Sequence, residues 1–370
     1  MRLIYLTGLN YPSAIANNQQ VMVMAGEFHT ILGTGDFTLI VNASRTAGEF
    51  AGFQPVTIGC GWKHFRLFYS AWWFFRHAKA LVNGRPDVVV YTKDPYFCLI
   101  SIFFKKIFGY KVVFESHLLF SPMVDWFIAR YADAILVLTS HLKTDLVAKG
   151  ASAQKIAVVP DAVDVAKFNL NISVAEARQK LHLPLDKKLV MYSGSLYVHE
   201  WKGVPVLCEA VQLLPPEYLV VLLGARNEAE KKRAEEAGKG RVLVVERKTH
   251  TEIPLYLQAA DALVLPNTRG NANSEKYTSP LKLFEYMAAR RPIVASDLPS
   301  IREVLSEKNS FLAEPGSAPS LAKAIVAATN NSGTDSGRIV DQAWNDVKDK
   351  TWHARAEDIL AFMRTAITMK

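Results

Sequence analysis

The stretch that decides the fold is SPLKLFEYMAARRPIVASD, residues 279–297. It begins with a Ser-Pro pair, which favours the start of a helix, and continues as an apolar segment at helical spacing. It then passes directly into the strand-like run 291–297. A helix followed at once by a short apolar strand is typical of a parallel α/β sheet. The helix also carries Lys282 and Glu285, two charges that packing alone does not require.

The same alternation of short apolar runs and amphipathic stretches continues along the whole chain. The runs of the first half are 2–8, 87–93, 111–117, 133–140 and 155–161. Those of the second half are 188–195, 218–225, 241–247, 261–267 and 291–297. Two successive β/α series predict an α/β protein with two doubly wound, Rossmann-like domains. The regular pattern lapses at 161–173, so the boundary is expected there.

Composition restricts the class of protein. The chain has 370 residues, enough for two domains, and half of them are hydrophobic. The net charge of +8 favours anionic partners such as phosphates or acidic lipid. Three scattered cysteines form neither a metal spacing nor a disulfide framework, which is typical of a cytoplasmic protein. No run is apolar enough to span a bilayer, and no motif for nucleic-acid binding is present.

The loop at 193–203 follows the first strand of the second series, contains Gly194 and ends with Lys202 and Gly203. In doubly wound domains such a loop lies at the carboxyl edge of the sheet, where phosphates meet helix N-termini. A lysine there supplies a compact positive charge for a phosphate. A solvated loop lysine explains the segment equally well, and both interpretations stay open.

The helix beginning near Pro280 offers a second set of phosphate contacts. The backbone N–H groups of Leu281 and Lys282 have no acceptor within the helix, and the helix dipole favours an anion beside them. One turn further, Glu285 can accept hydrogen bonds from the two hydroxyls of a ribose. Taken alone, however, a local pair between Glu285 and Arg290 or Lys282 is the simpler interpretation.

In combination these segments resemble the retaining glycosyltransferases of group 1, or family four, which have the GT-B fold. LFEYMAARRPIVASD is similar to the second half of their nucleotide-sugar signature, with Glu285 as its second glutamate. The segments 158–168 and 194–203 resemble the family's hinge and phosphate loop, and 352–363 its terminal helix. The resemblance covers nearly the whole chain. It implies an acceptor-binding domain at 1–165, a nucleotide-sugar-binding domain at 166–350 facing it across a cleft, and a helix at 351–370 that returns to the first domain.

The resemblance also implies a role for individual residues. His117 would lie beside the transferred sugar and the acceptor, Lys202 would neutralise the pyrophosphate, and Glu285 would bind the ribose. Tyr277 stands where the family has its first glutamate, and Ser195 where it has an arginine. The donor-binding residues expected by position are Asn17, Asn18, Gly194, Ser195, Lys202, Tyr277, Ser279, Leu281, Lys282 and Glu285.

The implied activity is transfer of a sugar from a UDP- or GDP-linked donor, with retention, to a glycan or lipid-linked acceptor. Cell-surface polysaccharide or glycolipid synthesis is the expected setting. Neither a cofactor nor a metal held by the protein is expected, and the sequence shows no cluster with metal-ligand spacing. The departures at Ser195 and Tyr277 leave an alternative open, a catalytically silent partner subunit that binds a nucleotide sugar.

Residues 61–81 are dense in aromatic and basic side chains, and residues 98–111 repeat the mixture. A core helix with basic ends is one interpretation. The other is a peripheral surface on the inner face of the membrane, with rings among the headgroups and basic residues at anionic lipid. The side chains expected at that surface are Trp62, Phe65, Phe68, Trp72, Trp73, Phe74, Lys63, Arg66, Arg76 and Lys79.

Overall fold

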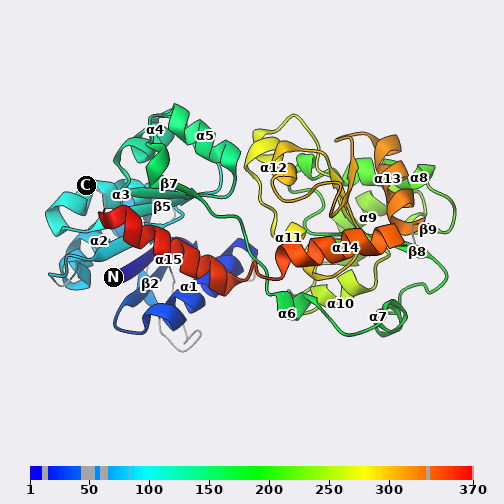
Figure 1. Ribbon diagram of the computed structural model, residues 1–370, viewed down its shortest axis with the longest axis horizontal. Coiled ribbons are helices and arrows are strands. Elements are labelled where there is room, and N and C mark those ends of the chain that lie inside the picture. Colours follow the sequence, from blue (N-terminus) through cyan, green and yellow to red (C-terminus); the bar gives the residue numbers. More distant parts are fainter. Residues whose placement is uncertain (11–15, 43–54, 59–65, 83, 331–333, 369–370) are drawn as a thin grey trace. The chain divides into compact units, whose positions relative to one another are not determined.

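The computed structural model describes residues 1–10, 16–42, 55–58, 66–82, 84–330 and 334–368. It divides into two compact units (Figure 1). The first comprises Met1–Pro160 together with Trp352–Lys370, and the second comprises Asp161–Thr351. Residues 161–165, which the resemblance placed in the first domain, lie in the second of these units, and the unit boundary coincides with the start of the segment 161–173.

In the described residues of the first unit, seven strands form one parallel sheet in the order β3-β2-β1-β4-β5-β6-β7. The strands are β1 (Arg2–Asn10), β2 (Phe37–Asn42), β3 (Val56–Ile58), β4 (Val88–Thr92), β5 (Lys111–Ser116), β6 (Ala134–Val137) and β7 (Ile156–Val158). The helices are α1 (Ala16–Leu32), α2 (Arg66–Val82), α3 (Pro95–Phe108), α4 (Pro122–Tyr131), α5 (Ser140–Ala148) and α15 (Trp352–Thr368).

The helices of this unit cover the two faces of its sheet. Helix α1 connects β1 to β2, toward one edge of the sheet. The connections that contain α2, α3, α4 and α5 run toward the opposite edge. Right-handed crossovers therefore place α1 on one face and these four helices on the other. Helix α15 lies alongside α1 (Figure 1). Its buried residues Ile359, Leu360 and Met363 share a core cluster with Tyr5 and Phe28.

The second unit, described over 161–330 and 334–351, has six parallel strands in the order β10-β9-β8-β11-β12-β13. The strands are β8 (Lys188–Ser193), β9 (Tyr218–Ala225), β10 (Val242–Glu246), β11 (Ala262–Leu265), β12 (Ile293–Ser296) and β13 (Phe311–Ala313). The helices are α6 (Val165–Phe168), α7 (Val174–Leu181), α8 (Val204–Leu213), α9 (Glu228–Gly238), α10 (Ile253–Gln258), α11 (Leu281–Ala288), α12 (Pro299–Arg302), α13 (Ala318–Asn330) and α14 (Thr334–Val347).

Strand order locates the place where each unit is best suited to bind a ligand. In the second unit β8 lies between β9 and β11, so the connections leave it in opposite directions. The crevice at the carboxyl end of such a strand is the usual ligand site of a doubly wound sheet. The two sheets confirm the two predicted β/α series. The reversal of direction at β8 makes the loop after this strand the candidate ligand site of the second unit.

Candidate functional site

The loop after β8 is held by glycines in backbone conformations that other residues rarely adopt. Gly194 has φ of +132° and Gly203 has φ of +72°. A Cβ at Gly203 would lie 1.7 Å from the carbonyl oxygen of Pro266, so no larger residue fits. Lys202 lies just before this turn, and its Nζ donates a hydrogen bond to Ser195 Oγ at 2.7 Å. The loop thus brings Gly194, Ser195 and Lys202 together.

Lys282 reaches the same loop from the first turn of α11. Its Nζ lies 3.9 Å from the centroid of the Tyr192 ring, and a Cβ at Gly194 would be 3.2 Å from that nitrogen. The Nζ atom is buried and has no hydrogen-bond acceptor among the described residues. Burial, and then repulsion by Lys202, hold the pKa of Lys282 well below its ordinary value. Burial also lowers the pKa of Lys202.

This arrangement favours an anion. Among the described residues, no carboxylate is hydrogen-bonded to either ammonium group. Helix α11 begins after Pro280 and has no side-chain cap, so the amides of Leu281 and Lys282 add the positive end of the helix dipole. An incoming anion would relieve the cost of burying Lys282 Nζ and of partly burying Lys202 Nζ.

Glu285 lies one turn further along α11 and is held by a histidine from another loop. His250 Nε2 is 2.9 Å from Glu285 Oε1, and His250 Nδ1 is 2.7 Å from Lys167 Nζ. An ammonium group only donates, so Nδ1 accepts and the imidazole proton lies on Nε2, directed at Glu285. The ring of Phe168 packs edge-on against His250. Glu285 is therefore a supported carboxylate rather than the freely moving partner of Arg290, which pairs with Asp341.

The remaining donor-binding residues expected from the sequence occupy different settings. Ser279 accepts a hydrogen bond from the Asp161 amide through its Oγ at 3.4 Å. Tyr277 ends the short helix η3 (Asn273–Tyr277), and its side chain is buried. Asn17 and Asn18 lie in the first turn of α1, and their side chains lie outside the described part of the chain.

In the first unit, His117 follows β5 and contacts a buried carboxylate. His117 Nε2 lies 2.7 Å from Glu115 Oε1, which also contacts Lys93 Nζ at 3.0 Å and Arg355 Nη2 at 2.9 Å. The Tyr91 hydroxyl donates to the other oxygen of Glu115. Burial alone would raise the pKa of Glu115, but Arg355, Lys93 and His117 outweigh it and hold that pKa well below its ordinary value. The carboxylate fixes the His117 ring and ties α15 to the sheet.

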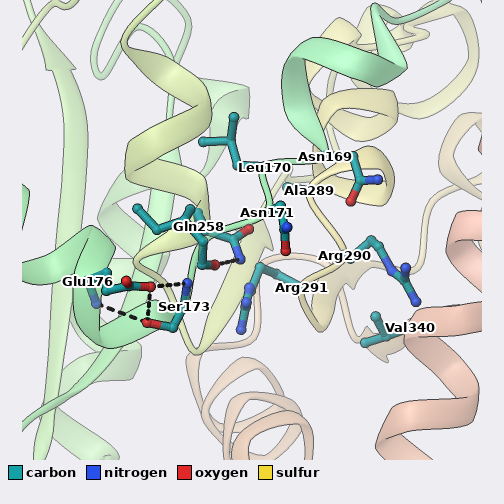
Figure 2. Close-up of a pocket in the computed structure, with 11 residues that line it drawn as sticks. Asn169, Leu170, Asn171, Ser173, Glu176, Gln258, Ala289, Arg290, Arg291 and Val340 are labelled. Atoms are coloured by element: carbon teal, nitrogen blue, oxygen red, sulfur yellow. Dashed lines mark hydrogen bonds between the residues drawn. The ribbon is translucent and has the colours of Figure 1, made fainter.

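A cavity of about 700 Å³ lies elsewhere in the second unit (Figure 2). Part of its polar lining is engaged locally, because Ser173 and Glu176 form a capping box and Gln258 donates to the Ile172 carbonyl. The cavity adjoins the C-terminal end of α11 at Ala289–Arg291, whereas the lysine pair adjoins the N-terminal end. None of the residues predicted to bind the donor lines it, and we assign it no role.

The described residues lack both a metal-binding cluster and a membrane-spanning helix. They contain no group of three or more His, Cys, Asp or Glu side chains that could hold a metal ion. They also contain no helix that combines the length and apolar character needed to cross a membrane.

Sequence reasoning missed Lys167, His250 and Glu115. The signal for His250 was available, because it follows the predicted strand 241–247 at the carboxyl edge of the sheet. Glu115 lies near the end of the predicted strand 111–117, and a carboxylate is unusual in such an apolar run. Lys167 had no such signal, since it lies where the regular pattern lapses.

Two family models match separate parts of the chain. The model described as Glycosyltransferase Family 4 matches residues 35–167, and the model described as Glycosyl transferases group 1 matches residues 187–331. The first therefore falls almost entirely within the first unit and the second within the second unit.

Curated relatives match over about half of the chain. The amylovoran biosynthesis glycosyltransferase AmsK of Erwinia amylovora is 32% identical over 189 residues, which is 49% of this chain and 44% of AmsK. TuaC of Bacillus subtilis (strain 168), whose name assigns it to teichuronic acid biosynthesis, is 29% identical over 196 residues. That match covers 53% of this chain and 46% of TuaC, so the chain spans less than half the length of either relative.

Solved structures match over the whole chain. A glycosyltransferase from Rickettsia africae has a TM-score of 0.78 at 15% identity and is covered completely, as is this chain. Anabaena Alr3699/HepE in complex with UDP and glucose has a TM-score of 0.76 at 16% identity, covering 99% of this chain and all of that one. Likeness at such low identity concerns the fold, and it confirms the predicted GT-B class.

Proposed function

Because the chain belongs to the glycosyltransferases that combine a family 4 domain with a group 1 domain, we propose that it transfers a sugar from a nucleoside diphosphate sugar. The acceptor in this proposal is a glycan or a lipid-linked glycan. The observation that carries it is the pair of ammonium groups beside the N-terminus of α11, the buried Nζ of Lys282 and the partly buried Nζ of Lys202. Glu285 lies one turn along the same helix.

This geometry suits the two ends of a nucleoside diphosphate. The lysine pair and the α11 amides would bind the diphosphate, and Glu285, supported by His250, would accept hydrogen bonds from the ribose hydroxyls. As the bond to the sugar breaks, negative charge grows on the leaving phosphate. Fixed positive groups stabilise such developing charge without reorganising at the moment of reaction. Lys202 and Lys282 would therefore act on turnover as well as on binding.

Retention without a covalent intermediate is the mechanism we favour. The carboxylate beside His117 is Glu115, which is fully buried and engaged by Lys93, Arg355 and Tyr91 as well. It is poorly placed to attack an anomeric carbon. Attack from the face that the leaving phosphate vacates, with that phosphate accepting the proton of the acceptor, needs no protein nucleophile. The lysine pair would also take over the charge-neutralising role that a metal ion has in other transferases.

The biological setting rests on the relatives. AmsK is named for amylovoran biosynthesis and TuaC for teichuronic acid biosynthesis, and HepE has been solved with UDP-glucose. We extend these to a role in polysaccharide synthesis with a UDP- or GDP-linked donor.

The proposal is tested with the purified full-length chain. UDP- and GDP-linked sugars are screened for thermal stabilisation, and donor hydrolysis and transfer are then assayed with and without EDTA. We expect stabilisation by one class of donor and turnover that survives EDTA. Binding without hydrolysis or transfer would favour the silent partner subunit suggested by Ser195 and Tyr277. Absence of binding to every nucleotide sugar would overturn the proposal.

Glu285→Ala is expected to weaken donor binding by about 1.5–3 kcal/mol, because charge-assisted hydrogen bonds to the ribose are lost. Calorimetric titration with the donor found in the screen measures the change. Glu209→Ala, which removes an exposed glutamate of α8, is the matched control and should bind normally. An unaltered donor affinity in Glu285→Ala would refute the ribose assignment.

His117→Ala is expected to lower kcat by about tenfold or more, which corresponds to about 1.4 kcal/mol of transition-state stabilisation. Donor affinity should change little, because His117 belongs to the other unit from the lysine pair. Stability should also be largely kept, since Glu115 retains Lys93 and Arg355. His353→Ala, at a half-exposed histidine paired with Glu27, is the control. Equal losses of kcat and donor affinity would argue against a place beside the transferred sugar.

A further inference from the structure

Exposed aromatic side chains gather on one face of the first unit. Every exposed Trp, Phe or Tyr among the described residues lies on α2, α3 or α4, or in the turn before α4. Aliphatic side chains add to them, and the exposure is large, reaching 73% at Phe103 and 80% at Met123. We call this the α2–α4 surface. Its members are Trp72, Phe75, Tyr96, Phe103, Ile107, Phe120, Met123, Trp126 and Tyr131.

These side chains form one surface because the three helices are neighbours on the same face of the sheet. Phe75 of α2 lies 5.2 Å from Phe104 of α3 between ring centroids, and Phe104 lies 5.1 Å from Phe103. On the other side of α3, Lys105 Nζ donates to the carbonyl of Tyr131 of α4 at 2.6 Å. Contiguous apolar exposure of this kind marks an interaction site rather than ordinary protein surface.

The exposed charged side chains described on α2, α3 and α4 have one sign. Arg76, Lys79, Lys106 and Arg130 are exposed on the same three helices. The sequences of α2 and α3 contain no acidic residue, and the single acid of α4, Asp125, is buried and accepts from the Phe120 amide. The surface therefore combines apolar rings with uncompensated positive charge, which complements an anionic partner.

We propose that the α2–α4 surface binds the headgroup region of an anionic lipid bilayer. Trp and Tyr favour the membrane–water interface, and aliphatic chains such as Ile107 and Met123 gain from leaving water there. A nucleic acid would use the basic residues and stack on rings, but it offers nothing to exposed aliphatic side chains. A protein partner would not require the described side chains of α2, α3 and α4 to lack exposed acids.

This surface differs from the one expected from residues 61–81 alone. Phe74 was expected to insert into lipid but is buried in the core of the unit. Trp62, Lys63 and Phe65 lie outside the described residues, as do the side chains of Arg66, Phe68 and Trp73. Helices α3 and α4 now supply most of the exposed rings. The mixed aromatic and basic surface therefore extends over α2, α3 and α4, rather than lying on residues 61–81 alone.

The experiment is vesicle sedimentation of the full-length chain at low and high salt. Vesicles of phosphatidylcholine alone are compared with vesicles containing phosphatidylglycerol. We expect binding to the anionic vesicles at low salt and weak binding to the neutral ones. Part of the binding should persist in 1 M salt, where the Debye length is only about 3 Å, because insertion of the rings does not depend on charge.

Two variants separate the apolar contribution to vesicle binding from the electrostatic contribution. Phe103→Gln/Ile107→Gln should remove most of the salt-resistant binding. Lys79→Gln/Lys106→Gln/Arg130→Gln should lower partitioning about a hundredfold at low salt, since each basic residue contributes about a fivefold factor. The matched controls are Leu185→Gln/Leu213→Gln and Lys232→Gln/Lys308→Gln/Lys323→Gln, which alter exposed residues of the second unit and should bind like the unaltered chain.

Donor affinity should be normal in all of these variants, so the lipid surface and the proposed transferase activity can fail separately. Light scattering gives the oligomeric state in the same samples. A dimer that Phe103→Gln/Ile107→Gln converts to a monomer, without vesicle binding, would assign the surface to self-association. Binding to single-stranded RNA in place of vesicles, or binding to neither, would also overturn the proposal.

Discussion

Replacing Lys282 by methionine is expected to reduce turnover about 10²–10³-fold, the typical effect of losing one group that stabilises negative charge developing in a transition state. The ligand-free chain should at the same time become more stable. Lys282 Nζ is buried without a hydrogen-bond acceptor in the described residues, and burial of an uncompensated charge costs free energy. Methionine has a similar length and no charge. Steady-state kinetics and thermal unfolding without donor measure the two effects.

The stability gain should depend on pH in a defined direction. The pKa of Lys282 lies well below 10.5 in the folded chain, so the folded state binds fewer protons than the unfolded state between the two pKa values. The stability of the unaltered chain should therefore rise with pH across that interval. In Lys282→Met this rise should be smaller, with the remainder due to Lys155, Lys167 and Lys202, whose pKa values are also lowered by burial.

Lys308→Met is the control, because it removes an exposed lysine from the same unit. It should change neither turnover nor the pH profile of stability. Retention of full activity in Lys282→Met would show that Lys202 and the helix amides suffice for the phosphate. A loss of both stability and activity would show that the ammonium group is paired in solution.

Glu115→Gln is expected to destabilise the first unit by about 3–5 kcal/mol, the usual cost of breaking a buried ion pair on one side. Glu115 is fully buried, and its removal leaves Lys93 and Arg355 without their shared carboxylate. Chemical denaturation of the whole chain measures the decrease in the free energy of unfolding. Asp341→Asn breaks the exposed pair with Arg290 and should cost no more than about 1 kcal/mol.

The pH dependence gives a second measurement of the same cluster. The folded pKa of Glu115 lies well below the ordinary value of 4.5, so its contribution is fully present above that pH. It is lost as the pH falls through the folded pKa. The unaltered chain and Glu115→Gln should therefore differ most at neutral pH and converge in acid. A constant difference at all pH values would mean that packing, not charge, is the cause.

The fold could be predicted from the sequence to the extent that strands are continuous apolar runs. Ten strands were predicted in this way, because both faces of a parallel sheet are covered and its strands are therefore apolar throughout. Three strands were not predicted. Strands β3 and β13 have three residues each and lie at the edges of their sheets, whereas β2 is an interior strand of six residues that was overlooked. Three residues by themselves leave too little periodicity to recognise, so strands as short as β3 and β13 are easily missed.

The candidate site was predictable only where its residues share a local pattern. Gly194, Ser195 and Lys202 lie in one loop, and Lys282 and Glu285 lie on one short helix, so spacing alone related them to each other. His250, which contacts Glu285, lies 35 residues before it in the chain. Lys167, which contacts His250, lies in a segment without a regular pattern. Arg355 reaches Glu115 across 240 residues of chain.

The sequence by itself determined two parallel α/β series, the lysine-bearing loop and helix of the second, and the presence of aromatic and basic residues in the first. These follow from hydrophobic period and from the chemistry of residues near one another in the chain. Tertiary structure alone decided that Lys282 is buried beside Tyr192, that Glu285 rests on His250, and that Phe74 points inward while Phe103 points outward. Burial and charge pairing depend on which elements pack together, and that is a property of contacts between segments far apart in the sequence.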